Sequence, residues 1–330
     1  MKLGELGEFG LIKRIASRVK NGDGVVIGIG DDAAATATSP GCLNLLTSDM
    51  LVEGIHFDLG YSDPHSLGRK SLAVNISDVA AMGGKPRNFL LSLAIPSGVN
   101  VEFIDSFCGG MLEIAEEFGV TLIGGDTCAS HRGLVVSVTL IGEQAPEKII
   151  RRNGATPGDL VLVSGNLGDS ALGLEMLRNG QRDGYAVRRH LDPTPRVREG
   201  VGLAEANLAT SMIDISDGVL ADLGHILEQS RAGATICPEK IPRSDFFLVN
   251  SPHYMSDPEM LALAGGEDYE LLFTARPGDY AKIIGLFQEL GTPVTCIGQI
   301  IAEQRLLVKT ASGEELAIDR RGYNHFARNP

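Results

Sequence analysis

The alternation of apolar and polar segments predicts mixed α and β structure in both halves of the chain. Apolar residues at helical spacing predict helices over 8–20, 101–118 and 219–230. A long helix is predicted to begin at Asp63-Pro64, because Asp is a good N-cap and Pro suits the first helical position, and to end at Gly83-Gly84. The other predicted elements are helices 169–179 and 278–290 and strands 25–29, 43–47, 90–95, 120–123, 134–141, 160–164, 211–215, 269–275 and 294–300.

A polar, turn-forming stretch at 151–159, RRNGATPGD, separates two β-rich halves. A chain of 330 residues also favours two domains, each large enough to bury its own core. We therefore predict a fold of the α/β (α+β) class with domains 1–150 and 151–330.

Composition and charge narrow the classes of function. The net charge of −13, without a Lys/Arg-rich stripe, argues against binding to nucleic acid. The five cysteines are scattered and form no C-x-x-C pair, so neither a zinc site nor a disulfide framework is predicted. The chain begins without a signal-like apolar region and holds no apolar run long enough to span a bilayer. We expect a cytoplasmic protein that does not bind membranes.

Aspartates recur beside glycines, beside small residues or at the ends of apolar segments. Such carboxylates are costly to bury unless a positive charge lies among them. If several converge, hard divalent cations, which prefer oxygen ligands, would neutralise them. Mg²⁺ together with a phosphate-bearing substrate is the leading hypothesis. The segments are GIGDDAA at 28–34, LLTSDM at 45–50, VNISDVAAMGG at 74–84, LIGGDT at 122–127, IDISDG at 213–218 and GGEDYEL at 265–271.

The standard sequence motifs for phosphate binding and hydrolysis are missing. The chain contains no G-x-x-x-x-G-K-[ST] loop, no protein-kinase motif set, no G-x-S-x-G and no H-E-x-x-H. If the protein binds nucleotide phosphates, metal ions must therefore provide most of the contacts with them.

In the first half, each acidic position has a functional and a structural interpretation. Asp32 follows a β run and fits a metal site or an Asx-turn. Thr47, Ser48 and Asp49 offer two hydroxyls and a carboxylate, which suit Mg²⁺ or a cap. Asp78 lies inside an apolar helix, so it either meets a cation or is hydrogen-bonded internally, for instance by Asn75 or Ser77.

The same ambiguity holds for the acids that follow. Asp126 comes after two glycines at a predicted strand end, which fits a ligand site or a tight turn. Ser216 or Asp217 can cap the helix 219–230, which leaves Asp214 unexplained. For the turn at 164–169, ordinary helix capping is the favoured interpretation. Glu267 and its neighbour either bind a cationic or hydroxylated part of a substrate or solvate a turn.

Taken in order, these segments resemble the thiamine-monophosphate kinase family. Further matching stretches are GEFGLI at 7–12, VEGIHF at 52–57, GDSALGL at 168–174, VLADLGHIL at 219–227 and GYNHF at 322–326. The resemblance implies the fold of aminoimidazole ribonucleotide synthetase and selenophosphate synthetase. In that fold the N-terminal domain binds ATP and Mg²⁺ and forms a β-barrel across a homodimer, while the C-terminal α/β domain closes the active site.

The resemblance also assigns roles to residues of this chain. Asp49, Asp126 and Asp217 are the most critical of the implied ligands, and Asp31 is a weaker candidate than its neighbour. No residue is assigned as a general base. The implied metal ligands are Asp32, Thr47, Ser48, Asp49, Asp78, Asp126, Asp214 and Asp217; the ATP contacts are Gly125, Asp126, Arg152 and Ser216; the residues near the thiamine end are His56, Glu267 and Tyr323.

The implied reaction is direct in-line transfer of the γ-phosphoryl group of ATP to thiamine monophosphate, giving thiamine diphosphate. No protein base is needed, because a phosphate monoester has a second pKa of about 6 and its oxygens are largely deprotonated near neutral pH. Several Mg²⁺ ions would remove the repulsion between the two anionic substrates, and Arg152 would add one positive contact.

Other proteins of the same fold are the alternatives. Selenophosphate synthetases carry a reactive Cys or selenocysteine near the N-terminus, whereas the first cysteine here is Cys42. Aminoimidazole ribonucleotide synthetases lack the combination of GGEDYEL and GYNHF. Hydrogenase-maturation relatives act through a C-terminal Cys, whereas this chain ends in HFARNP. A non-catalytic scaffold is disfavoured because every matched motif keeps its acid.

Overall fold

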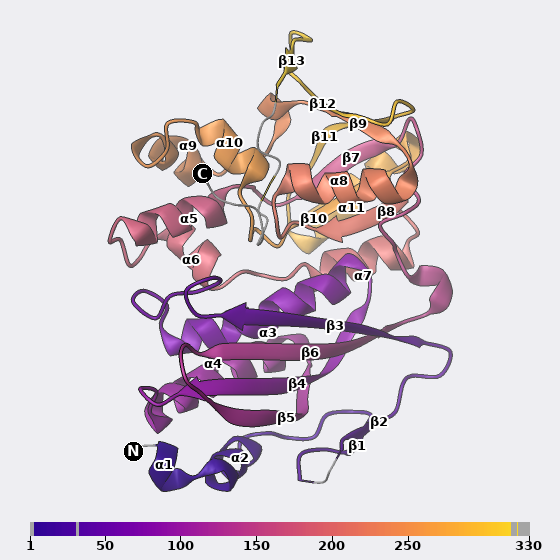
Figure 1. Ribbon diagram of the computed structural model, residues 1–330. Coiled ribbons are helices and arrows are strands. Elements are labelled where there is room, and N and C mark those ends of the chain that lie inside the picture. Colours follow the sequence, from indigo (N-terminus) through magenta and orange to yellow (C-terminus); the bar gives the residue numbers. More distant parts are fainter. Residues whose placement is uncertain (1–2, 31–32, 318–321, 323–330) are drawn as a thin grey trace. The chain divides into compact units, whose positions relative to one another are not determined.

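The computed structural model describes residues 3–30, 33–317 and 322, and within it the chain divides into two compact units (Figure 1). Unit 1 comprises Met1–Val79 and Gly84–Glu147, and unit 2 comprises Ala80–Gly83 and Lys148–Pro330. Each unit contains both helices and a sheet, which confirms the predicted mixed fold class. Among the described residues, no helix is long and apolar enough to cross a membrane.

Unit 1 is built on a four-stranded sheet with the strand order β3-β6-β4-β5. Strands β3 and β4 are each antiparallel to β6, which lies between them, and β5 runs parallel to β4 at the edge. Figure 1 shows the two long helices α3 and α4 on one face of this sheet. The elements of unit 1 are α1 (Leu3–Leu6), α2 (Glu8–Ala16), β1 (Val25–Ile27), β2 (Ala35–Thr36), β3 (Leu43–Val52), α3 (Pro64–Ala81), β4 (Lys85–Pro96), α4 (Val101–Phe118), β5 (Thr121–Ser130) and β6 (Val135–Gln144).

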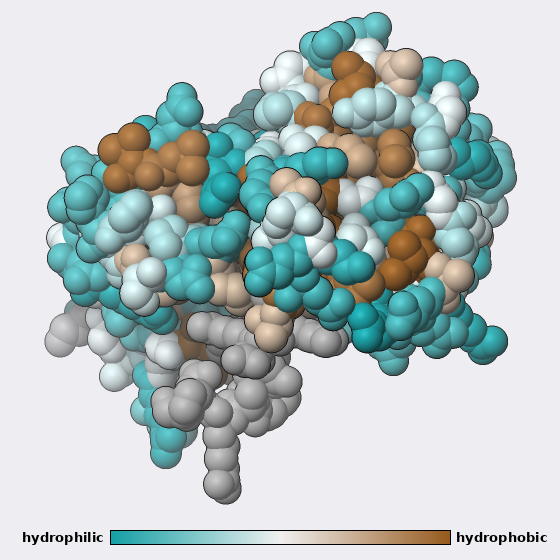
Figure 2. Space-filling view, turned by 90° about the horizontal axis from the view of Figure 1, so that it is seen from above, coloured by the Kyte–Doolittle hydropathy of each residue, from teal (hydrophilic) through white to brown (hydrophobic). Residues whose placement is uncertain are grey.

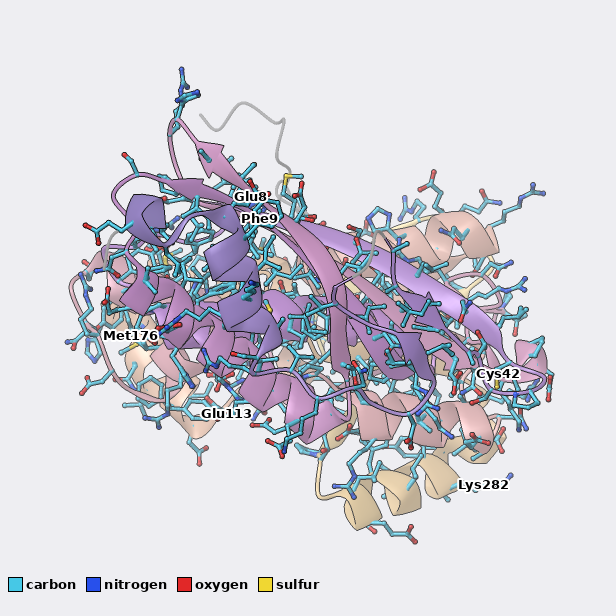
Figure 3. The ribbon with its side chains drawn as sticks, turned by 90° about the horizontal axis from the view of Figure 1, so that it is seen from below. Glu8, Phe9, Cys42, Glu113, Met176 and Lys282 are labelled. Atoms are coloured by element: carbon cyan, nitrogen blue, oxygen red, sulfur yellow. The ribbon has the colours of Figure 1, made fainter. Side chains whose placement is uncertain are left out.

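Helices α3 and α4 approach each other closely through two glycines. A Cβ atom on Gly68 would lie 1.9 Å from the carbonyl oxygen of Phe107, and one on Gly110 would lie 2.0 Å from that of His65. At the outer side of the contact, Arg69 of α3 pairs with Glu113 of α4, which is labelled in Figure 3, at 3.0 Å. These contacts hold α3, the helix that carries Asp78, firmly in unit 1.

Unit 2 contains a seven-stranded sheet with the order β13-β12-β9-β11-β7-β10-β8, antiparallel except for β12 beside β9. Its strands are β7 (Leu160–Ser164), β8 (Ser211–Asp214), β9 (Gly233–Ile236), β10 (Leu271–Ala275), β11 (Val294–Ile301), β12 (Leu306–Lys309) and β13 (Glu315–Leu316). Its helices are α5 (Asp169–Arg178), α6 (Tyr185–Leu191), α7 (Val197–Glu205), α8 (Val219–Ser230), α9 (Asp245–Asn250), α10 (Pro258–Ala264) and α11 (Tyr280–Leu290), with short 3₁₀ turns at Pro238–Lys240, Ser251–His253 and Pro277–Asp279. A further 3₁₀ turn, Pro146–Lys148, includes the last residues of unit 1 and the first of the second segment of unit 2.

A buried apolar cluster joins α7 and α11 to the middle of this sheet. Phe287 of α11 stacks on Phe273 of β10 with ring centroids 5.9 Å apart, and Leu203 of α7 and Leu162 of β7 belong to the same cluster. Figure 2 shows a surface that is mostly hydrophilic, with hydrophobic residues in small separate patches. Such patches are ordinary for a globular protein.

Helices α4 and α8 and strand β7 have the bounds that the sequence predicts, but the four strands of the unit 1 sheet are longer than predicted. Strand β3 continues to Val52 and β5 to Ser130. Asp49 and Asp126 therefore lie inside strands and not after them, which corrects the sequence interpretation. The extensions are partly exposed, at Ser48 and Met50 in β3 and at Gly125, Asp126, Cys128 and Ala129 in β5. They therefore lack the continuous apolar run by which the strands were predicted.

Candidate active site

In unit 1, strand β3 and helix α3 bring Thr47, Asp49 and Asp78 together. Side chains alternate along a strand, so Thr47 and Asp49 share the face of β3 that packs toward α3. The Thr47 hydroxyl donates a hydrogen bond to Oδ2 of Asp78. The backbone N–H of Asp49 donates to Oδ1 of Asn75, one turn earlier on α3, at 3.1 Å.

The two carboxylates of this group repel each other. Burial, followed by the nearby Asp78 carboxylate, raises the pKa of Asp49 to about 6. A cation placed between them would remove this repulsion. Mg²⁺ is commonly held by one or two carboxylates, with waters and substrate phosphates completing its shell. Two carboxylates and a hydroxyl therefore fit such an ion.

Ser48, by contrast, points to the opposite face of the sheet. Its hydroxyl lies 3.2 Å from the carbonyl oxygen of Val138 and 3.0 Å from Oγ1 of Thr139 on β6. The structure therefore does not group the side chain of Ser48 with those of Thr47 and Asp49. Its role as a metal ligand stays a prediction.

Asp126 also lies apart from the pair on β3 and α3. The sheet order places β5 three strands from β3, which is about 14 Å at the usual spacing. The pairing register aligns Asp126 with Ser92, Ser137 and Met50, on the face that carries Ser48. Asp126 is exposed, and its Oδ1 accepts the N–H of Thr127 at 2.8 Å. Its metal and ATP roles stay predictions.

Gly125 has a structural role beside its predicted contact with ATP. Its φ is +154°, and a Cβ atom there would lie 1.8 Å from the carbonyl oxygen of Leu91 on β4. Only glycine permits this close pairing of β5 with β4.

His56 closes the turn that follows β3. Its Nδ1 accepts a hydrogen bond from the backbone N–H of Val52 at 3.0 Å, so a neutral His56 ring carries its proton on Nε2. The predicted contact of His56 with the substrate is not tested by this geometry. Asp32, together with Asp31, and Tyr323 lie outside the described residues. Arg152 is exposed, and its carbonyl oxygen accepts the Ser230 hydroxyl at 3.3 Å.

Unit 2 carries a second acidic group where β8 leads into α8. Asp214 is buried at the end of β8, and Asp217 lies in the following loop. One oxygen of Asp222, in the first turn of α8, accepts the backbone N–H groups of Ser216, Asp217 and Gly218, each at 3.1 Å. The predicted cap by Ser216 or Asp217 is wrong, because α8 begins after Gly218 with no side-chain cap at that residue.

The sequence interpretation missed Asp222. The signal was present, since Asp222 is an acid within an apolar helix, as Asp78 is. Burial and the neighbouring carboxylates of Asp214 and Asp217 raise the pKa of Asp222 to about 8. This crowding of negative charge again suits a cation.

Neither group forms a complete metal cage by itself. Among residues 3–30, 33–317 and 322, no three or more His, Cys, Asp or Glu side chains are arranged to hold a metal ion. A Mg²⁺ site usually has only one or two carboxylate ligands, and substrate phosphates and waters supply the others. Each of the two acidic groups fits a site of this kind.

The segment 265–270 is hydrogen-bonded to residues 214–217, which we call the acidic loop. The N–H of Glu267 donates to the carbonyl oxygen of Ser216 at 2.8 Å, and that of Tyr269 donates to Ile215 at 2.9 Å. The Glu267 carboxylate lies 3.2 Å from Nδ1 of His190. Glu267, predicted to contact the substrate, is thus joined directly to the loop that holds Asp214 and Asp217.

Asp268 is buried and anchors the same segment to helix α5. Its carboxylate accepts the N–H groups of Gly168 at 2.7 Å and Ser170 at 3.2 Å. The prediction of ordinary capping at 164–169 is therefore wrong, because the cap residue Gly168 has no side chain and Asp268 binds these amides instead. Burial raises the pKa of Asp268 to about 7, although the two amides and Arg189 act in the opposite direction.

Comparison with family models places both halves in one group. The model of the AIR synthase related protein N-terminal domain matches residues 30–144, and that of the C-terminal domain matches residues 156–310. The chain is 40% identical over 331 residues to a thiamine-monophosphate kinase of Escherichia coli strain K12, covering 97% of this chain and 98% of the relative. It is 37% identical to a thiamine-monophosphate kinase of Bacillus subtilis, covering 97% and 100%.

Solved structures agree with these matches. A thiamine-monophosphate kinase from Stenotrophomonas maltophilia superposes with a TM-score of 0.83 at 35% identity, covering 93% of this chain and 96% of that one. The structure of AaThiL complexed with AMPPCP and TMP superposes with a TM-score of 0.77 at 33% identity and covers 99% of both chains. The Escherichia coli hydrogenase maturation protein HypE, with a TM-score of 0.79 at 18% identity, shares the fold.

The buried Asp268 predicts a distinct dependence of stability on pH. Its pKa is about 7 in the folded chain and near its ordinary value of 3.8 when unfolded. A raised acid pKa favours folding only while the group is protonated, so this contribution is lost as pH rises from about 4 to about 7. Relative to Asp268→Asn, whose side chain does not ionise, the wild type should lose stability over that range.

Urea unfolding of both proteins at about pH 5 and about pH 8 measures the effect. The free energy of unfolding of the wild type minus that of Asp268→Asn should be smaller at the higher pH. A difference that stays constant or grows with pH would contradict the assignment. The charged groups that contribute to the pKa of Asp268 are Arg189 and Asp169.

Proposed function

The chain belongs to the AIR synthase related family and, within it, to the thiamine-monophosphate kinases, and we propose that it transfers the γ-phosphoryl group of ATP in line to thiamine monophosphate with the help of Mg²⁺. The fold is accordingly the two-domain one of that family. The relatives match over nearly their whole length, and AaThiL has been captured with AMPPCP, an ATP analogue, and TMP. The protein is therefore an ATP-dependent kinase acting on thiamine monophosphate.

The observation that carries the proposed role of Mg²⁺ is the group formed by Thr47, Asp49 and Asp78. Strand β3 and helix α3 bring their oxygens together, and burial and the Asp78 carboxylate raise the pKa of Asp49 to about 6, which favours a cation at this group. In unit 2, Asp214 and Asp217 offer a second set of oxygen ligands beside Asp222. We propose several ions, with Asp32, Ser48 and Asp126 as further ligands.

Bound Mg²⁺ supplies charge neutralisation for the phosphate oxygens and for the transferring group. The side chains and backbone of the protein bind and orient the two substrates. We propose that Gly125, Asp126, Arg152 and Ser216 contact ATP, and that His56, Glu267 and Tyr323 contact the thiamine end. No general base is proposed, since the acceptor phosphate, with a second pKa of about 6, is largely deprotonated near neutral pH. We expect this ATP-dependent reaction in the cytoplasm.

The direct test is incubation of the purified protein with ATP, Mg²⁺ and thiamine monophosphate, followed by chromatography. Thiamine diphosphate and ADP are expected in equal amounts. Parallel reactions with selenide and with other phosphorylated acceptors identify the alternatives within the fold. Activity on one of those acceptors, without activity on thiamine monophosphate, would overturn the assignment.

Removing one charge from the Asp49–Asp78 pair should abolish most of the activity. Asp78→Asn keeps the shape of the side chain but removes a negative ligand. We expect kcat to fall by at least about 100-fold, the scale of one lost electrostatic contact in a transition state. Turnover is measured over a range of Mg²⁺ concentrations.

Asp63→Asn is the matched control on the same helix. Asp63 caps α3 by accepting the N–H of Ser66 at 3.0 Å, and Asn caps a helix about as well. This variant should keep near-normal turnover. Near-normal turnover of Asp78→Asn at limiting Mg²⁺ would remove Asp78 from the metal ligands.

We also propose a homodimer formed through the face of the unit 1 sheet that α3 and α4 do not cover. Leu46 and Met50 on β3 have exposed fractions of 69% and 57% on that face, and the register aligns Leu46 with the half-buried Ile141 of β6. A row of exposed apolar side chains on one sheet face favours burial against a second sheet. Ser48 and Asp126 share this face and would lie at the interface.

Leu46→Asp should therefore shift the protein from dimer to monomer, because a carboxylate would be buried without a partner. Sedimentation velocity should give about twice the 35.0 kDa chain mass for the wild type and a single chain mass for the variant. Leu248→Asp, which places the same charge on the exposed helix α9 of unit 2, should remain dimeric. A wild-type monomer, or a dimer that persists in Leu46→Asp, contradicts this interface.

A further inference from the structure

A buried ionic cluster in unit 2, the Glu270 clamp, consists of Ser164, Arg189, Arg196 and Glu270. The Glu270 side chain has an exposed fraction of 1%, and its carboxylate accepts Nε and Nη2 of Arg196, both at 2.6 Å. It also accepts Nη2 of Arg189 at 2.9 Å and the hydroxyl of Ser164 at 2.6 Å. A single carboxylate thus receives four hydrogen bonds from three side chains.

The backbone of Gly165 also packs against the Glu270 side chain. Gly165, with a φ of +59°, lies so close that a Cβ atom would be 2.2 Å from Oε1 of Glu270. Arg189 and Arg196 have exposed fractions of only 14% and 18%. Buried ion pairs of this kind contribute little net stability, because desolvating the charges offsets their attraction. Their larger effect is to fix the positions of the groups that they join.

Glu270 connects the clamp to the acidic loop through its backbone. The carbonyl oxygen of Glu270 accepts the N–H of Ile215 at 2.8 Å, and the register of β10 with β8 pairs Leu271 with Asp214. Arginines therefore fix the side chain of Glu270, while its main chain supports Ile215, the residue after Asp214.

The backbone before Glu270 is strained. Glu267 and Tyr269 have φ values of 65° and 51°, in the left-handed region. Residues with a side chain are disfavoured there, and such conformations persist only where the surroundings determine them. Their N–H groups bind the carbonyl oxygens of Ser216 and Ile215. Without the strained geometry these two hydrogen bonds to the acidic loop would not form together.

We propose that the Glu270 clamp is a positioning device for the acidic loop 214–217. Glu270 holds the segment 266–270 in its strained conformation, and that segment holds Ile215 and Ser216. The carboxylates of Asp214 and Asp217 are thereby kept in place for a divalent cation. The effects on turnover and on metal binding rest on the proposed function, whereas the effect on amide exchange does not.

The test replaces Glu270 with Gln, which has the same shape but no charge. Amide hydrogen exchange, followed by mass spectrometry, should become at least about tenfold faster in peptides that cover 213–218 and 265–270. Mn²⁺ titration, followed by the electron paramagnetic resonance signal of the free ion, should show one class of sites weakened about tenfold, which is about 1.4 kcal/mol. The Mg²⁺ concentration for half-maximal turnover should rise correspondingly.

Asp159→Asn controls for a general loss of stability. Asp159 is buried in the same unit and accepts hydrogen bonds from Thr156 and Thr210, near the end of β8 and β10 that lies away from Asp214. This variant should lose stability without a change in Mn²⁺ affinity. If Asp159→Asn and Glu270→Gln weaken Mn²⁺ equally, the clamp has only a structural role and the proposal is overturned.

Arg196→Lys keeps the test decisive if Glu270→Gln does not fold. Lysine retains the charge but replaces the two bonds of the guanidinium by one, so faster exchange and weaker Mn²⁺ binding of the same kind, but smaller, are expected. Wild-type exchange and Mn²⁺ affinity in every clamp variant that folds would overturn the proposal. A wild type that binds Mn²⁺ as expected but does not phosphorylate thiamine monophosphate would disprove the proposed function and leave the clamp intact.

Discussion

The repulsion between carboxylates that are buried close together is the constraint on which the rest of the structure depends. In unit 1 it acts between Asp49 and Asp78, and in unit 2 among Asp214, Asp217 and Asp222. Each charge withdrawn from water raises the cost of the next one. Strand β3 and helix α3 nevertheless bring the first pair together, and the segment from β8 into α8 brings the second group together. The divalent cations that we propose at these groups would remove the repulsion.

The protein treats its buried acids in two ways. Some are satisfied from within: Asp222 and Asp268 accept backbone amides, and Glu270 accepts two guanidinium groups. These acids shape loops. Asp49, in unit 1, lies beside the Asp78 carboxylate, and burial and this neighbour raise its pKa to about 6. In unit 2, the segment that carries Asp268 and Glu270 is hydrogen-bonded to the loop between Asp214 and Asp217, so these acids belong to one arrangement.

Of the four described non-glycine residues with a left-handed backbone conformation, two lie beside the acidic loop of unit 2. Glu267 and Tyr269 occupy the left-handed region beside the acidic loop, and Gly125 permits a close approach of β5 to β4. Strain of this kind needs rigid surroundings. In unit 2 the arginines of the Glu270 clamp provide them, while the apolar cluster around Phe273 and Phe287 supports the sheet beneath.

The sequence by itself determined the class of the fold, the bounds of α4 and α8, the acidic motifs and the family, because these depend on local spacing and on ordered short segments. Only the tertiary structure decided which acids share a face. Ser48 and Asp126 point away from Asp49 because of strand alternation and register, and Asp222 and Glu270 gain their roles from partners distant in sequence. Such pairings follow from how the strands of a sheet are ordered, and no local pattern of residues encodes that order.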